Sequence, residues 1–205
     1  MRKSNRLRGF FLALFIVLLL PVASGFESSA QAPRLGEKGA SRRELHLPIS
    51  DFSLTDQLGR PFRFQSLKGR VILLSFVYTS CPDVCPLITA SALSAQRALR
   101  AWEKPSVFFL TVTTDPEVDT PLVLRAYANR FGVDLSNWSL LTGENSALAS
   151  VWKVFGVKVK RKARGLVEHT PLTAIVDRQG ILRVVYIGSS PDSRRLLRDI
   201  RALLS

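Results

Sequence analysis

Short hydrophobic segments separated by polar turns run along most of the chain and predict strands alternating with helices. Continuous apolar runs predict buried strands, over residues 71–78, 107–113 and 138–141. Apolar residues at three- and four-residue intervals predict helices, over residues 88–102, 121–131, 144–155 and 190–204. Pairs of short segments predict antiparallel hairpins, 49–54 with 61–64 and 172–176 with 181–187. This order predicts one α/β domain, a mixed central sheet flanked by helices.

The predicted helix over 121–131 has clear end signals. Thr120 is a residue type favoured as an N-cap, and Pro121 suits the first helical position. Gly132 follows the last apolar residue, Phe131, at a position where glycine commonly ends a helix. We therefore expect this helix to begin at Pro121 and to end at Phe131.

The N-terminus has the pattern of a targeting segment. Residues 2–8 are cationic, residues 10–20 are eleven unbroken apolar residues, and Pro21 with small residues follows. Extended to Ala23, the apolar stretch has fourteen residues, about 21 Å of helix against a hydrocarbon core of roughly 30 Å. This length indicates that residues 1–25 are a cleaved signal peptide. A retained N-terminal membrane anchor is the alternative, because flanking residues could lengthen the apolar segment.

The predicted targeting segment divides the chain into three parts. Residues 26–47 are rich in Ser, Ala, Gly, Pro and charge without periodicity, so we expect a flexible tether, with His46 exposed to solvent. Residues 48–205 form the predicted folded domain. We expect this domain to be exported, to the periplasm or the outer face of the cytoplasmic membrane.

Composition limits the chemistry of the exported part. Two cysteines and two histidines exclude a disulfide-dense scaffold and a zinc site of four cysteines. The formal net charge is +13, but four basic residues lie in the targeting segment, and from Glu27 onward 25 basic residues face 16 acidic ones. An exported basic chain without interleaved aromatic and basic residues is not expected to bind nucleic acid.

The two cysteines, Cys81 and Cys85, lie between a predicted central strand and a predicted helix. The free N–H groups of a helix N-terminus lower the pKa of a thiol and favour the thiolate. Four-residue spacing on the first helical turn would place both sulfurs on one face. Two thiolates held in this way suit Cu(I), a disulfide, or alternation between the two.

Other interpretations of the cysteine pair are weaker. A structural disulfide would close only three intervening residues and would add little chain-entropy stabilisation. Inert buried thiols would not need the flanking prolines, Pro82 and Pro86. A redox pair and a metal clamp therefore both remain as hypotheses.

Residues 76–86, FVYTSCPDVCP, resemble the cysteine signature of the Sco/SenC copper proteins, thioredoxin-like factors in cytochrome c oxidase assembly. Further segments resemble the family in the same order, 52–57 with 59–62, 114–121, 141–143, 155–157 and 168–170. The resemblance covers about residues 50–200 and implies a thioredoxin-like fold with an N-terminal hairpin.

The resemblance also implies a third ligand. Without it, His169 would be interpreted as a satisfied loop or core side chain; with it, Cys81, Cys85 and His169 form a copper site of two sulfurs and one nitrogen. Two thiolates suit Cu(I), and the imidazole makes Cu(II) acceptable as well. Zinc is less favoured because a fourth ligand is missing.

The implied function is that of a copper chaperone that delivers copper to cytochrome c oxidase and catalyses no covalent reaction. The expected partners are the copper-receiving subunit of a respiratory oxidase, other copper chaperones, and a membrane through the N-terminus. The alternative is a thiol–disulfide oxidoreductase, with Cys81 and Cys85 as its redox pair, that keeps partner cysteines reduced for metallation.

Residues around the implied site carry further expectations. Asp115 and Asp119 are expected to make turn and capping hydrogen bonds, with a supporting role beside the metal as the alternative for Asp115. Pro171, directly before a strand, resembles the cis-proline of thioredoxins, although an ordinary strand-start proline would fit equally. A basic segment precedes His169 and is expected to be a solvent-exposed hairpin, comprising Lys158, Lys160, Arg161, Lys162 and Arg164. We hypothesise that it steers docking onto an acidic copper-receiving domain.

Overall fold

The computed structural model describes residues 40–162, 165–188 and 191–205 of the chain. The strands are β1 (Ser41–Pro48), β2 (Ser53–Asp56), β3 (Pro61–Arg63), β4 (Val71–Val77), β5 (Val107–Thr113), β6 (Trp138–Thr142), β7 (Val159–Arg161), β8 (Val167–His169), β9 (Leu172–Val176) and β10 (Ile181–Ile187). The helices are α1 (Val84–Arg97), α2 (Pro121–Phe131), α3 (Asn145–Val154) and α4 (Ser193–Ala202), with short 3-10 turns η1 (Phe64–Leu67) and η2 (Lys104–Ser106).

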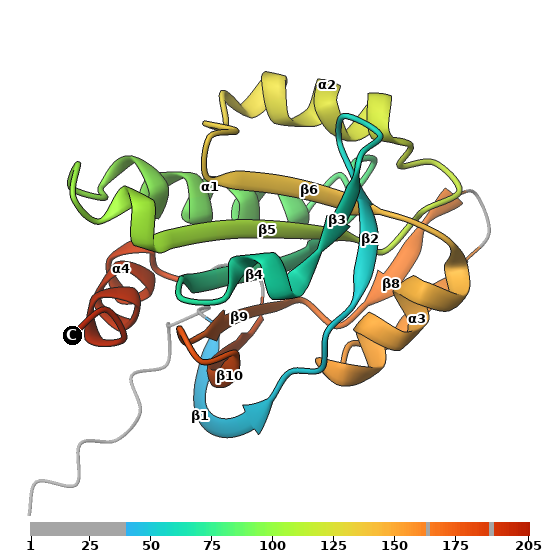
Figure 1. The fold of residues 1–205 in the computed structure, drawn as a ribbon. Helices are drawn as coiled ribbons and strands as arrows, with labels where there is room; N and C mark the ends of the chain where they lie inside the picture. Colours follow the sequence, from blue (N-terminus) through green and yellow to red (C-terminus); the bar gives the residue numbers. More distant parts are fainter. Residues whose placement is uncertain (1–39, 163–164, 189–190) are drawn as a thin grey trace, which may run out of the picture. The chain divides into compact units, whose positions relative to one another are not determined.

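Eight of these strands form one mixed sheet in the order β1-β10-β9-β4-β5-β6-β2-β3 (Figure 1). β4, β5 and β6 run parallel to one another at its centre. β9 pairs antiparallel with β4 on one side, and β2 pairs antiparallel with β6 on the other. Because parallel neighbours need crossover connections, α1 and α2 follow β4 and β5 directly along the chain. The predicted mixed sheet with flanking helices is confirmed.

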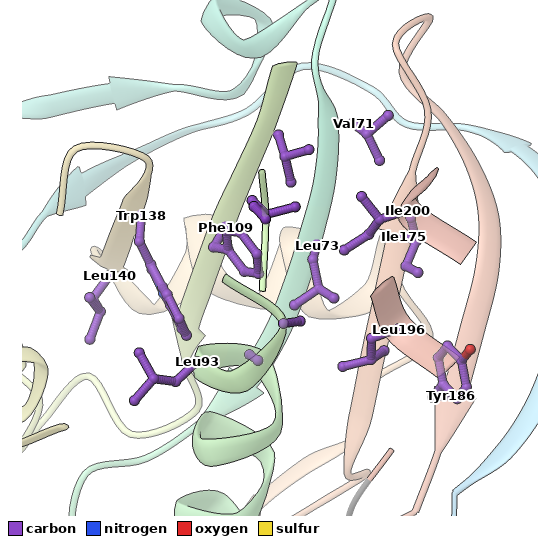
Figure 2. Packing of buried hydrophobic residues seen from close by; sticks show 14 of the residues in the cluster. Val71, Leu73, Leu93, Phe109, Trp138, Leu140, Ile175, Tyr186, Leu196 and Ile200 are labelled. Atoms are coloured by element: carbon purple, nitrogen blue, oxygen red, sulfur yellow. The ribbon is translucent and has the colours of Figure 1, made fainter. Parts of the chain in front are cut away.

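Alternating side chains of the central strands fill two cores, one on each face of the sheet. Leu73 of β4 belongs to the core under α1, α2 and α4, and its neighbours Ile72 and Leu74 belong to the core under α3 and η1. Figure 2 shows Leu73 of the first core packed near Leu196 of α4. Every residue of β4, β5 and β6 is buried, so apolar runs without alternation are the expected sequence of strands covered on both faces.

The boundaries predicted for α2 are confirmed. The helix runs from Pro121 to Phe131, and the Thr120 hydroxyl accepts a hydrogen bond from the backbone N–H of Val123 at 3.4 Å. Gly132 ends the helix in the left-handed region, with φ of 67°. Both hairpins predicted from paired segments are also present, as β2–β3 and β9–β10.

The predicted tether over 26–47 is wrong for its last residues. Ser41–Pro48 forms β1, which pairs antiparallel with β10 at the edge of the sheet. All eight residues of this strand are exposed, His46 among them, so the strand has no apolar periodicity that a sequence pattern could reveal. Side chains anchor it instead: Arg42 donates to the buried Asp199 at 2.6 Å.

The helix predicted over 88–102 ends earlier, at Arg97. Its apolar spacing extends to Trp102, but that side chain is 71% exposed and lies beside the Arg100 guanidinium, 5.2 Å from the ring centroid. The stripe itself is confirmed for Ile88, Ala92 and Ala95, which are buried.

The predicted signal peptide or anchor, residues 1–25, and the first part of the tether lie outside the described residues. Within the ranges that the structure describes, no helix combines the length and the hydrophobicity needed to cross a bilayer.

Candidate metal and thiol site

The loop that carries Cys81 connects the end of β4, at Val77, to the start of α1, at Val84. Cys85 lies on the first turn of α1, as predicted, but Cys81 precedes the helix. The prediction that both cysteines occupy the first helical turn is wrong because Pro82 disfavours helical backbone at the residue before it. Cys81 instead closes a turn, in which its backbone N–H donates to the Tyr78 carbonyl at 3.2 Å.

The two thiols are free, lie against each other and have different environments. Burial raises the pKa of Cys81, but hydrogen bonds from the backbone N–H groups of Asp83 and Cys85 and from the Tyr78 hydroxyl outweigh it, so the pKa is lowered overall. Burial raises the pKa of Cys85 well above the usual range, and the neighbouring Cys81 adds to that rise. The more accessible sulfur is therefore the better thiolate, and the fully buried Cys85 keeps its proton.

The third predicted residue, His169, ends β8 and approaches the cysteines from a segment far along the chain. Its Nε2 lies 3.6 Å from the Sγ of Cys85. Its Nδ1 lies 3.1 Å from the Thr170 carbonyl, and because a carbonyl only accepts, Nδ1 carries the proton. Burial lowers the pKa of His169, and the Thr170 contact opposes this effect. A neutral imidazole therefore points its Nε2 lone pair at the thiol.

Tyr78 is a site residue that sequence reasoning did not single out. Its ring meets the His169 ring edge-on, with centroids 5.8 Å apart and an interplanar angle of 83°. Burial, together with its hydrogen bond to Cys81, raises the pKa of the Tyr78 hydroxyl to about 12. Tyr78 thus contacts both the Cys81 thiol and the His169 imidazole. Its signal in the sequence is an aromatic residue at the end of an apolar run, just before the cysteine segment.

The donor set can be tested against the geometry of a bound metal. Among the described residues, no group of three or more His, Cys, Asp or Glu side chains is arranged to hold a metal ion. Two ligands at about 2.0–2.3 Å from one metal, at tetrahedral to trigonal angles, are separated by about 3.5–3.8 Å. The 3.6 Å between Cys85 Sγ and His169 Nε2 lies in that range. The structure thus brings two of the predicted ligands to a suitable separation and places Cys81 against Cys85, without closing the three around one point.

Asp119 fixes the cysteine loop to the end of β5. Its buried carboxylate accepts hydrogen bonds from the Thr79 hydroxyl at 2.5 Å, from the Thr79 backbone N–H at 3.2 Å and from the Thr113 hydroxyl at 2.5 Å. Burial raises the pKa of Asp119, and these hydrogen bonds oppose the rise. These are not the expected turn and capping hydrogen bonds: the Asp119 carboxylate joins the end of β5 to the loop that carries Cys81, and the cap of α2 is Thr120.

The basic segment before His169 forms the predicted hairpin, with β7 paired antiparallel to β8 in a sheet of its own. Lys158, Lys160 and Lys162 line an open hollow of about 640 Å³ whose wall includes His169. Arg161 points the other way and pairs with Asp115. Arg164 lies outside the described residues.

Pro171 connects this hairpin to β9 and lines the same hollow. No peptide bond among the described residues is cis, so the bond before Pro171 is trans. The likeness to the cis-proline of thioredoxins therefore does not extend to its isomer, and Pro171 is an ordinary proline preceding a strand.

A mixed sheet flanked by helices, with one cysteine in the loop after a central strand and the other on the first turn of the following helix, defines a thioredoxin-like protein. The sequence profile of the SCO1/SenC family matches residues 41–205. The chain belongs to this family. A SCO2-like protein of Rickettsia felis is 32% identical over 148 residues, which cover 69% of this chain and 70% of the relative. A SCO1 homologue of Bacillus subtilis is 34% identical over 99 residues, and the match spans about half of each protein, 48% of this chain and 51% of the relative.

Solved structures agree with the fold. A SCO1/SenC family lipoprotein from Bacillus anthracis superposes with a TM-score of 0.71 at 32% identity, covering 80% of this chain and 98% of that one. ScoI from Bradyrhizobium japonicum with copper bound superposes with a TM-score of 0.63 at 28% identity, covering 77% and 99%. A third structure is BsSco, described as having a disulfide switch and as a member of the Sco family of cytochrome c oxidase assembly proteins. It superposes with a TM-score of 0.67 at 25% identity, covering 79% of this chain and 96% of that one.

Proposed function

We propose that this protein is a copper chaperone that delivers copper to cytochrome c oxidase during its assembly. The observation that carries the proposal is the 3.6 Å approach of His169 Nε2 to Cys85 Sγ, which joins a nitrogen and a sulfur donor from segments far apart in the sequence. The copper-bound Bradyrhizobium relative and the assembly role of BsSco support it. Cys81, Cys85 and His169 are the proposed ligands.

The environment of each donor suits a transferable metal. Cys81, with its lowered pKa and its slightly greater exposure, supplies the thiolate that first meets copper. Cys85 loses its proton as the second sulfur ligand, and the neutral His169 needs no deprotonation. Thiolates favour Cu(I), whereas the imidazole extends the set to Cu(II). Copper then passes to the partner by exchange of ligands, without a covalent product.

The contact between the two thiols favours a second candidate, a thiol–disulfide oxidoreductase. The Cys81 thiolate would attack a partner disulfide and release one partner thiolate, and Cys85 would then lose its proton and attack the mixed disulfide. The partner leaves as a dithiol, and this chain becomes the disulfide, which an external dithiol reductant must reduce. The disulfide switch described for BsSco supports this candidate.

The proposed place of action is outside the cytoplasm, at the periplasmic side of the membrane, because the N-terminal segment has the pattern of an export signal or anchor. The proposed recipient presents an acidic surface. Lys158, Lys160 and Lys162 would meet that surface beside His169, which would bring the acidic partner to the copper ligand.

Titration of the reduced protein with Cu(I) against a competing chelator tests the copper proposal. We expect one tight site per chain. His169→Ala should lower the Cu(I) affinity by about 100-fold or more, since substitution of a residue that only supports a ligand already lowers metal affinity by about 10- to 100-fold. Loss of affinity with retained folding would support the chaperone. Weak binding by both proteins, with catalysed disulfide reduction retained, would instead favour the oxidoreductase.

A further inference from the structure

The hairpin that carries His169 is not part of the eight-stranded sheet. Among the strands that the structure describes, β7 and β8 pair only with each other, so no strand pairing of the main sheet includes the histidine. Val159 and Val167 of the hairpin pack against the apolar cluster that contains Cys81 and Cys85. Apolar packing holds the hairpin near the cysteines but is non-directional. A directional contact is needed to set the imidazole at one distance from the thiol.

Arg161 makes one such contact, in addition to the hydrogen bond between the Val167 backbone and the Tyr78 hydroxyl. Val159 and Arg161 share one face of β7, and Lys160 lies on the other. The Arg161 guanidinium donates to the Asp115 carboxylate and lies 3.3 Å from a Glu117 carboxylate oxygen through its Nε. The Asp115 side chain is 1% exposed, and its Oδ2 has no hydrogen-bond partner within the described residues. Arg161 is therefore the cation that compensates this buried carboxylate.

The turn that Arg161 contacts also holds the cysteine loop. The Asp115 carbonyl accepts from the backbone N–H of Asp119 at 2.9 Å, and the Asp119 carboxylate binds Thr79, two residues before Cys81. Turn 115–119 thus connects the loop that carries one proposed ligand to the hairpin that carries another.

We propose that Arg161 is a positioning residue, which sets His169 Nε2 beside Cys85 Sγ by fixing the β7–β8 hairpin to turn 115–119. The part of this inference that is measured by Cu(I) affinity rests on the proposed function. The positioning itself is a property of the metal-free protein and can be measured without copper.

Hydrogen exchange of the full reduced, metal-free chain tests the positioning. In Arg161→Ala, we expect the β7 and β8 amides to exchange about tenfold faster than in the unaltered protein. In Arg161→Lys, we expect a smaller increase in the exchange rate, because one ammonium cannot fully replace the forked guanidinium. The matched control is Arg63→Ala, which removes an exposed pair with Asp51 from another hairpin and should leave β7–β8 exchange unchanged. Unchanged exchange in both Arg161 variants would overturn the proposal.

A double-mutant cycle for Cu(I) affinity tests whether Arg161 acts through His169. Arg161→Ala should weaken Cu(I) binding by about 10- to 100-fold, as residues that orient a ligand do. In the His169→Ala background the same substitution should have no further effect. Equal losses in both backgrounds would overturn the proposal. If the unaltered chain holds no Cu(I) at all, the proposed function fails, and the exchange experiment still decides the role of Arg161.

Discussion

The two sheets in the described part of the chain differ in the contacts that hold them. The eight-stranded sheet has central strands that are buried along their whole length and cores on both faces. The β7–β8 hairpin has Val167 in a small apolar cluster with Val159 packed against it, and the ion pair of Arg161 with the buried Asp115 joins it to turn 115–119. In Figure 1 the labelled β8 lies at the edge of the fold, apart from the central strands. Cys81 and Cys85 therefore lie on a loop and a helix that continue directly from a central strand, whereas His169 lies on a two-stranded hairpin outside the main sheet.

The largest expected effect comes from the rigid side of this comparison. Phe109 lies fully buried in β5 and stacks on Trp138, with ring centroids 5.1 Å apart. Phe109→Ala should lower the free energy of unfolding by about 3–5 kcal/mol, because it leaves a cavity in the core. Denaturant unfolding measures the change. His169→Ala is the comparison variant, and a loss of similar size there would contradict the division between the two sheets.

The next effect compares the two thiols. The lowered pKa of Cys81 means that its thiolate fraction, and its alkylation by iodoacetamide, should rise to a plateau at lower pH than for an ordinary thiol. The raised pKa and full burial of Cys85 should keep it slower by on the order of 100-fold near neutral pH. Cys85→Ser should therefore retain fast labelling and Cys81→Ser should lose it. The reverse pattern would show that the thiol roles are exchanged.

The smallest effect concerns the outer face of the hairpin. Changing Lys158, Lys160 and Lys162 to Glu should slow association with a polyglutamate peptide by about tenfold at low ionic strength, and the difference should shrink as salt is added. The control changes the same number of charges on α4, where the exposed arginines to be replaced by Glu are Arg194, Arg195 and Arg198. Figure 1 places α4 on the opposite side of the fold from β8. Equal slowing by both triple variants would indicate a response to net charge alone.

The elements with a strong local signal could be predicted from the sequence. Apolar runs predicted β4 and β5, and Thr120 and Gly132 marked the ends of α2, because burial on both faces and helix capping leave their own residue types. β1 could not be predicted, since all its residues are exposed and its pairing with β10 joins positions far apart in the chain. The end of α1 before Trp102 was likewise missed because an exposed aromatic continued the apolar spacing.

The candidate site divides in the same way. Cys81 and Cys85 were identified from their local setting, and His169 required the family resemblance because nothing in its neighbourhood marks a ligand. Tyr78 and Arg161 were identified as site residues only from the tertiary structure. Tyr78 contacts Cys81 and His169, and Arg161, unlike the lysines beside it, pairs with Asp115. The contacts of Tyr78 with His169 and of Arg161 with Asp115 join segments far apart in the chain, so no local pattern reports them.

The sequence by itself determined the central strands, the boundaries of α2, the cysteine pair and the family, because these depend on short-range patterning. The tertiary structure decided which thiol is the better thiolate, which imidazole nitrogen faces Cys85, and which basic residue of the hairpin points inward. Those properties arise from burial and from hydrogen bonds between distant segments, and they exist only once the chain has folded.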